Sequence, residues 1–317
     1  MKYLLNYLTK TKTNIYLTVL QVVISGLTFF LLYRYLYQTL GPEKIGLWSL
    51  VIAFASSARI GELGLAAGVV KFVAEARGQD NHLLSAKIIQ TVFISLTGIL
   101  IVLSYPAFML FSFGLSFLVT EPYLTLGIEI LPFTILSILM MVGVAVISGG
   151  LDGYMLMGLR NAVLSISHII YLILVYSLVP SYDLLGVAYA QCIQSFLLFI
   201  TLWILMKIRV KDLPFIPNTW DFQLLKEMMR YGITFQTITI VNLFFEPLIK
   251  VAMTYWSGLA NLGLYEMANK LALQIRSVIV ESNRIIVPIL AGKNISKDQS
   301  NKGQEYVSQS FRLVIYS

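Results

Sequence analysis

Apolar runs of about 20 residues recur from one end of the chain to the other. A helix needs roughly 20 predominantly apolar residues to cross the hydrocarbon core of a bilayer, which is about 30 Å thick. Membrane β-barrels use shorter segments in which apolar and polar residues alternate, and no such alternation is present. Because a bilayer admits only helices and closed barrels, the sequence predicts an all-α polytopic membrane protein.

Composition agrees with a membrane protein and removes several function classes. Hydrophobic residues make up 57% of the chain and charged residues 12%, whereas a soluble domain has roughly 25% charged residues. The formal net charge is +7, but the basic residues lie in loops between apolar runs, so we expect no nucleic-acid partner. The one cysteine, Cys192, lies within an apolar run and allows neither a disulfide framework nor a cysteine-based metal site.

The apolar runs define eight predicted spans separated by polar breaks. The first run is too long for a signal peptide and lacks a small-residue cleavage pattern, so we expect an uncleaved first span. After a polar stretch at 293–304, the start of a ninth apolar segment follows at Tyr306. The predicted spans are 15–37, 45–70, 88–111, 124–147, 162–179, 184–205, 231–256 and 262–290.

The basic residues alternate between the two sides of these spans. Short cytoplasmic loops carry an excess of Lys and Arg. The N-terminal segment and the even-numbered loops are basic, whereas the odd-numbered loops contain Lys44 and almost no other basic residue. This alternation supports the span count and predicts a cytoplasmic N-terminus.

A faint internal repeat accompanies the spans. The segment 41–48 reads Gly-Pro-Glu-Lys-Ile-Gly-Leu-Trp, and 217 positions later the segment 258–265 reads Gly-Leu-Ala-Asn-Leu-Gly-Leu-Tyr. Each segment joins an outward-running span to an inward-running one, and the same offset pairs Arg59 with Arg276. Because an even number of spans separates the copies, we expect parallel repeats related by an axis along the membrane normal.

The repeat and one loop suggest how the chain is divided. The loop at 208–225 is basic and contains Pro214 and Pro217, as is typical of a linker. We therefore expect a first six-helix bundle at 1–207, a cytoplasmic basic linker at 208–225, and at 226–317 the start of a second bundle with two helices and part of a third.

The sequence resembles a known family of transporters. Leu-Gly-Pro-Glu-Lys-Ile-Gly-Leu-Trp-Ser-Leu at 40–50, Gly-Glu-Leu-Gly-Leu at 61–65 and Gly-Val-Val-Lys-Phe-Val-Ala-Glu at 68–75 resemble the polysaccharide biosynthesis proteins. These are the O-antigen and capsule repeat-unit flippases (Wzx-like) of the multidrug/oligosaccharidyl-lipid/polysaccharide exporter superfamily. The segments 262–265 and 288–290 resemble the same element at the start of that family's second bundle.

The resemblance implies a fold and a function. The fold is two six-helix bundles that face each other across a central cavity opening alternately to each side. The cargo is a polyprenyl-pyrophosphate-linked oligosaccharide in the bacterial inner (plasma) membrane, used for O-antigen of lipopolysaccharide, capsule or exopolysaccharide, with other polysaccharide assembly proteins as partners. Most spans of the family's second bundle are missing here, so we expect a C-terminally truncated chain.

Ionisable side chains inside spans cost about 2.5–3.5 kcal/mol each on insertion scales and often mark function. Several have an opposite charge at helical spacing and can neutralise it on the same helix. These pairs are Glu246–Lys250 and Glu266–Lys270 at i,i+4, and Arg59–Glu62 and Glu281–Arg284 at i,i+3. His168 has no such neighbour, and we interpret it as a packed, hydrogen-bonded histidine.

Four basic residues are the predicted substrate contacts. Arg59 and Arg276 match in the repeat and fall near the middle of spans two and eight, so we expect them to grip the pyrophosphate. Guanidinium suits this role because its planar fork binds phosphate oxygens bidentately and stays protonated. Arg34 and Lys250, near the outer ends of spans one and seven, are further candidates. The spans carry six cations and five carboxylates, so the expected cavity is only weakly basic.

The carboxylates have a separate interpretation. Glu62 or Glu129 could couple transport to H⁺ or Na⁺, because a buried carboxylate with a raised pKa can carry a proton. In the alternative interpretation, Glu62 only pairs with Arg59.

Three alternative functions remain open. A cation-coupled drug exporter of the same superfamily would need an acidic cavity, against which the two mid-span arginines argue. A polysaccharide-pathway membrane enzyme would need a large catalytic loop outside the membrane, and no loop here is long enough. A non-transporting assembly subunit is the third alternative. Motifs for phosphate loops, zinc or nucleophilic catalysis are absent, so we expect no enzyme, no cofactor and no metal.

Overall fold

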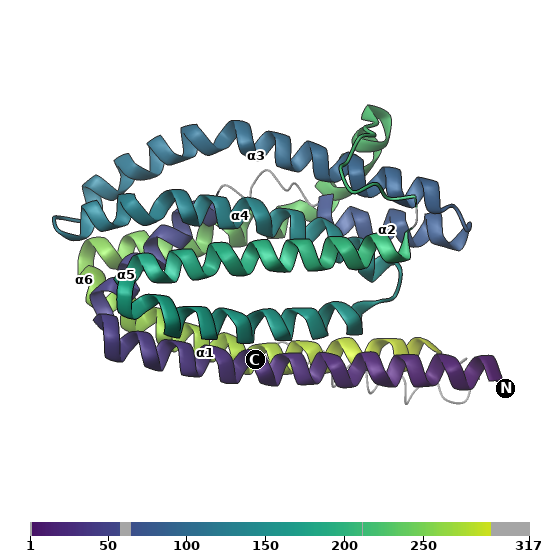
Figure 1. Ribbon diagram of the computed structural model, residues 1–317, viewed down its shortest axis with the longest axis horizontal. Helices are drawn as coiled ribbons and strands as arrows, with labels where there is room; N and C mark the ends of the chain where they lie inside the picture. The colour runs from purple at the N-terminus through teal and green to yellow at the C-terminus, as the bar shows by residue number, and fades with distance from the viewer. Residues whose placement is uncertain (1, 58–64, 211, 293–317) are drawn as a thin grey trace.

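The fold consists of six helices in the part of the chain that the computed structural model describes, residues 2–57, 65–210 and 212–292. No strand occurs in these residues, and the prediction of an all-α polytopic membrane protein is confirmed. Figure 1 shows the helices lying roughly along one axis, with α3 on one outer side and the N-terminal part of α1 and the C-terminal part of α6 on the other. The helices are α1 Lys2–Ser57, α2 Leu65–Gly78, α3 His82–Leu118, α4 Tyr123–Gly153, α5 Met157–Arg209 and α6 Phe222–Gly292.

Three of the helices contain a sharp bend, so that each covers residues of two predicted spans. α1 bends at Gly41 (φ 78°, ψ 168°) and α6 at Gly258 (φ 79°, ψ 171°). Glycine permits these positive φ angles because it has no Cβ. α5 doubles back at Asp183 (φ 54°), as Figure 1 shows. The nearly identical angles at the two glycines agree with the predicted repeat.

Hydropathy and length identify membrane-spanning helices directly. Within the described residues, four stretches are long and apolar enough to cross a membrane, and two of them contain the bends in α1 and α5. These stretches are Tyr16–Ser56, His82–Leu118, Tyr123–Gly153 and Met157–Arg209. Predicted spans three and four therefore lie in α3 and α4, and spans five and six lie in the two arms of α5.

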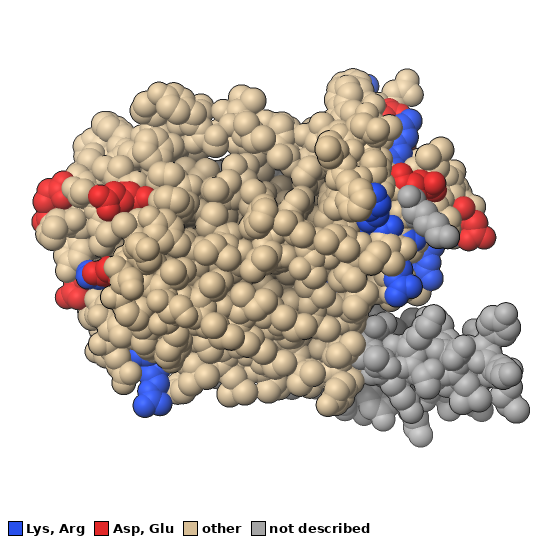
Figure 2. Space-filling model, viewed as in Figure 1, with Lys and Arg blue, Asp and Glu red and all other residues tan. Residues whose placement is uncertain are grey.

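The molecule has two polar ends. At one, here named the N-terminal end, α1 begins and the turns between α2 and α3, α4 and α5, and α5 and α6 lie; the bends of α1, α5 and α6 lie at the opposite, far end. On the face drawn in Figure 2, charged side chains gather at these two ends and a broad band between them shows none. This distribution is the one that a bilayer imposes, because charges are costly in its core.

Two clusters of buried apolar side chains hold the helices together. The cluster near the N-terminal end joins α2, α3, α4, the second arm of α5 and the first turns of α6. The cluster near the far end joins α1 to α3, α4, both arms of α5, and Leu262 of α6. The division into bundles at 208–225 stays a prediction. α6 nevertheless packs against helices that precede this loop in the sequence.

α1 and α6 touch backbone to backbone at the far end. A Cβ on Gly46 would overlap the carbonyl group of Leu259 in α6, and a Cβ on Gly263 would overlap the carbonyl group of Pro42 in α1. The contact is reciprocal, because Leu259 and Gly263 follow Pro42 and Gly46 by the same 217 positions as the repeat. The two copies of the repeated segment therefore form the crossing between α1 and α6, here named the glycine crossing.

We expect Gly263→Ala and Gly46→Ala each to destabilise the protein, because the added methyl group forces the two backbones apart. Overpacking of this kind costs about 1–3 kcal/mol, which corresponds to about 2–4 °C per kcal/mol in the melting temperature of a chain of this size. Thermal unfolding in detergent measures the effect. Gly98→Ala in α3 is the matched control, because its Cβ would meet nothing within 4 Å; equal melting temperatures for all three variants would contradict the crossing.

Candidate functional site

A buried ion pair joins the two arms of α6. Lys250 on the first arm places Nζ 2.9 Å from Oε2 of Glu266 on the second arm. Each residue is only 3% exposed. Removing one partner of a buried pair leaves an unpaired charge and costs about 3–5 kcal/mol. The pair therefore fixes the spacing of the two arms next to their bend.

Two neighbouring charges extend this pair along both arms. Lys270 places Nζ 3.4 Å from Oε1 of Glu266, and the Glu246 carboxylate lies 3.9 Å from Nζ of Lys250. Both are the i,i+4 pairs predicted from the sequence, which are confirmed. The contact between Lys250 and Glu266 was not predicted, because it joins two arms that are distant along the chain.

The first copy of the repeat supplies hydroxyl groups at the positions that match the pair. Tyr33 and Ser49 in α1 precede Lys250 and Glu266 by 217 positions. Both lie close enough to Glu266 to interact with it electrostatically. Ser49 and Glu266 each follow the crossing glycine of their own copy by three residues, which is about one helical turn. This polar cluster, Tyr33, Ser49, Lys250 and Glu266, lies one turn inside the glycine crossing.

Further polar side chains follow α1 toward the N-terminal end. The Gln21 side-chain amide donates to Ser25 Oγ at 3.1 Å, and Ser25 Oγ lies 2.7 Å from Nδ1 of His168 in α5. The ring of Phe29 contacts the imidazole at a centroid distance of 5.5 Å. The interpretation of His168 as a packed, hydrogen-bonded residue is confirmed.

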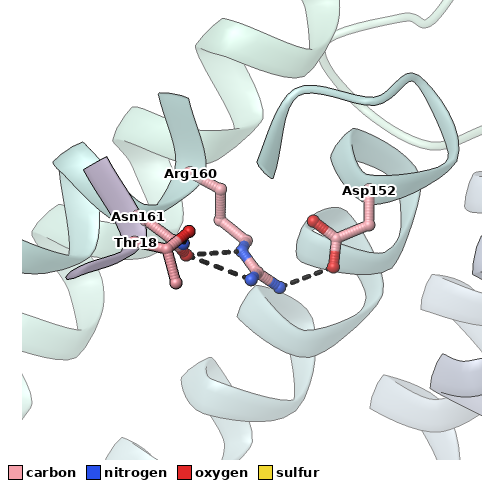
Figure 3. A network of polar contacts seen from close by, with 4 residues as sticks. All are labelled: Thr18, Asp152, Arg160 and Asn161. Atoms are coloured by element: carbon pink, nitrogen blue, oxygen red, sulfur yellow. Dashed lines mark hydrogen bonds and ion pairs between the residues drawn. The ribbon is translucent and has the colours of Figure 1, made fainter. Parts of the chain in front are cut away.

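A second ionic network ties α1, α4 and α5 together at the N-terminal end (Figure 3). Arg160 donates from Nη1 to Asp152 at 2.6 Å and from Nε and Nη2 to Oδ1 of Asn161. The Asn161 amide donates in turn to Thr18 Oγ1 at 2.8 Å. Thr18, Gln21 and Ser25 are spaced by three and four residues, so they share one face of α1.

The predicted substrate residues fall into different environments. Arg276 and Arg34 are exposed. Lys250 is buried and paired with Glu266, so in this conformation its charge is neutralised within the protein. Arg59 lies outside the described residues. Arg276 follows Glu266 by ten positions, or about 15 Å along the helix toward the N-terminal end.

Of the two predicted coupling carboxylates, the structure describes only Glu129. Glu62 lies outside the described residues, and Glu129 is exposed on α4. Glu266 is the buried carboxylate of the polar cluster, and its pairing with Lys270 within one helix concealed it from sequence reasoning. Among the residues that the structure describes, no group of three or more His, Cys, Asp or Glu side chains could hold a metal ion.

The fold is similar to solved transporters of the MOP superfamily. An inward-facing multidrug resistance MATE family transporter has a TM-score of 0.69 and 14% identity, covering 96% of this chain and 66% of that one. An outward-facing MATE family transporter has a TM-score of 0.56 and 15% identity, covering 97% of this chain and 77% of that one. A MOP transporter from Pyrococcus furiosus has a TM-score of 0.52 and 15% identity, covering 89% of this chain and 71% of that one. It is described as having a binding pocket of reversed polarity. At these identities the likeness concerns the fold.

Sequence comparison places the chain more specifically. No curated protein sequence matches it significantly. A family model described as polysaccharide biosynthesis protein matches residues 11–292. This match includes the glycine crossing, the polar cluster and both ionic networks, and it covers most of the chain. The chain therefore belongs to the polysaccharide biosynthesis protein family.

Proposed function

We propose that this transporter moves polyprenyl-pyrophosphate-linked oligosaccharide repeat units across the bacterial inner membrane by alternating access, for surface polysaccharide biosynthesis. The N-terminal end would then face the cytoplasm and the far end the outside, as the loop charges predict. The glycine crossing is the observation that carries the proposal, because it closes the far end through two equivalent segments. The family supports the nature of the cargo.

The glycine crossing suits a closure that must open in every cycle. The two backbones meet directly at the glycines, and the buried Leu262 beside them packs into the apolar cluster of the far end, so opening separates a short backbone contact and exposes the apolar side chains next to it. The ion pair below it also favours easy opening. Burying two charges carries a desolvation penalty that their attraction offsets only in part, and water entering between α1 and α6 would relieve it.

The second arm of α6, from the polar cluster toward the N-terminal end, carries two cations for the pyrophosphate. Lys270 is partly exposed beyond Glu266, and Arg276 is exposed further along. Charge-assisted hydrogen bonds to phosphate oxygens are about twice as strong as neutral ones. Lys270 joins the predicted contacts Arg59 and Arg276, whereas Lys250 becomes available only if its pair with Glu266 opens.

Polar groups on α1 and α5 suit the sugar portion of the cargo. Gln21, Ser25 and His168 supply an amide, a hydroxyl and an imidazole along one side of α1, which bond to one another in this conformation. Oligosaccharides are recognised by such donors and acceptors together with aromatic faces, and Phe29 adds an aromatic ring next to His168. Coupling to H⁺ or Na⁺ stays a hypothesis, with Glu62, Glu129 and the buried Glu266 as candidates.

Reconstitution tests the cargo directly. The full-length protein in liposomes is expected to move a fluorescent polyprenyl-pyrophosphate oligosaccharide between leaflets, measured as loss of protection from a membrane-impermeant quencher. Export of cationic drugs without movement of the sugar lipid would instead indicate the drug exporter. Movement of neither compound by a folded protein would favour an assembly subunit.

We expect Arg276→Gln and Lys270→Gln each to slow movement of the sugar lipid about tenfold, which corresponds to losing about 1.4 kcal/mol of interaction. Arg276→Lys should recover part of the rate, because it keeps the charge and loses the bidentate geometry. Lys226→Gln, an exposed lysine near the start of α6, is the matched control. Wild-type rates in both Arg276→Gln and Lys270→Gln would exclude them as cargo contacts.

The ion pair predicts an asymmetric set of stabilities. Glu266→Gln should destabilise more than Lys250→Met, because it leaves Lys250 with only the distant Glu246, whereas Lys250→Met leaves Glu266 with Lys270. The double variant Lys250→Met/Glu266→Met should recover most of the loss, since a buried pair can often be replaced by apolar residues. Thermal unfolding of the four proteins measures this, and additive losses would show that the two residues do not interact.

A further inference from the structure

The connection between α5 and α6 is attached at two places. Its first residues pack into the buried core, and its later residues bond to α3. Val210 and Leu213 are buried in the apolar cluster at the N-terminal end. From there, residues 212–222, here named the strap, cross the outer side of α3 before α6 begins (Figure 1). The contacts of the strap with α3 distinguish it from a free linker.

Polar atoms of the strap point inward, onto one face of α3. The buried side chain of Gln90 accepts hydrogen bonds from the backbone N–H groups of Asn218 and Thr219, at 3.0 and 3.2 Å. The Trp220 indole N–H donates to Ser95 Oγ at 2.9 Å. The backbone N–H of Asp221 donates to Thr91 Oγ1 at 3.3 Å. Thr91 and Ser95 are four residues apart and share one face of α3, and Gln90 lies beside that face, one residue before Thr91.

Asp221 completes the attachment. Its carboxylate lies 2.7 Å from Nζ of Lys87 in α3 and accepts hydrogen bonds from the N–H groups of Gln223 and Leu224 at the start of α6. The bond from Lys87 and the bond from Leu224 hold the pKa of Asp221 below its usual value, so this carboxylate stays ionised at neutral pH. One side chain therefore caps α6 and ties it to α3.

Four apolar side chains of the strap face the surroundings instead. Phe215 is 68% exposed, Ile216 80%, Trp220 52% and Phe222 62%. A loop in water shows the reverse polarity, with polar atoms outward. Fully burying one such apolar side chain is worth about 1.5–3 kcal/mol, so four exposed together call for a covering apolar medium.

Basic residues flank this apolar surface at the end of α5. The ammonium of Lys207 lies 3.0 Å from the centroid of the Phe215 ring, and Arg209 is exposed. The nearby Asp212 is exposed as well, whereas Asp221 is already paired with Lys87. The strap thus combines outward aromatic side chains with adjacent cations, at the level where charged side chains reappear in Figure 2.

We propose that the strap is a lipid-binding surface: Phe215, Ile216, Trp220 and Phe222 seat in the headgroup–acyl boundary of the leaflet at the N-terminal end, and Lys207 and Arg209 bind anionic phospholipid headgroups. Aromatic side chains concentrate at this boundary, and basic residues near it are attracted to anionic lipids. Lipid also explains the inward polarity, because the strap satisfies the polar side chains of α3 that would otherwise face hydrocarbon. This proposed role of the strap does not depend on which cargo the protein moves.

Spin-label depth measurements test the seating. In the full-length protein with Cys192→Ser, a nitroxide at Ile216→Cys should collide more with oxygen than with a water-soluble nickel chelate in nanodiscs. The same label at Gln79→Cys, on the exposed turn before α3, should show the opposite preference. Equal nickel accessibility at both positions would overturn the proposal and point to a protein partner as the cover of this surface.

Lipid selectivity tests the headgroup contact. A fluorophore at Ile216→Cys should be quenched several-fold more by brominated phosphatidylglycerol than by brominated phosphatidylcholine, each diluted into the same bilayer. Lys207→Gln/Arg209→Gln should abolish this difference and leave the depth unchanged. Equal quenching by the two lipids in the protein with both basic residues would overturn the anionic-lipid assignment. Unchanged melting temperatures would show that the variants remain folded.

Discussion

The hydrocarbon core of a bilayer contains no water to bond with backbone N–H and C=O groups, and the whole architecture follows from that constraint. Each segment must satisfy its own backbone, so the chain crosses as helices and changes direction only at the polar ends. The bends at Gly41, Asp183 and Gly258 lie at the far end for this reason. The strap obeys the same constraint by pairing its backbone N–H groups with Gln90 where α3 reaches the N-terminal end.

The two copies of the repeat share a backbone and differ in their chemistry. Both bend at glycine with nearly the same angles, and both lack a side chain where α1 and α6 meet. One turn further, one copy carries the neutral Tyr33 and Ser49 and the other the charged Lys250 and Glu266. The shared backbone makes a symmetric closure, and the unequal side chains place the buried charge on α6 alone.

Much of the fold was predictable because a bilayer leaves few options. Span length and loop charge identified the spans now found in α3, α4 and α5, and the repeated glycines marked both bends. The pair of Lys250 with Glu266 was not predictable. Each residue already has an oppositely charged partner at i,i+4 on its own arm, so nothing in the sequence pointed to a partner on the other arm. The strap was not predictable either, since Gln90 binds backbone N–H groups, which are identical in every sequence.

The placement of opposite charges on the arms of α6 also determines how the far end responds to membrane voltage. A single elementary charge that crosses the membrane potential exchanges about 2.3 kcal/mol per 100 mV. Lys250 and Glu266 move together as a pair of zero net charge, and the adjoining Lys270 and Glu246 also sum to zero. Displacing these four side chains together therefore performs almost no electrical work, so the polar cluster and its two neighbouring charges contribute little to any response of the far end to voltage.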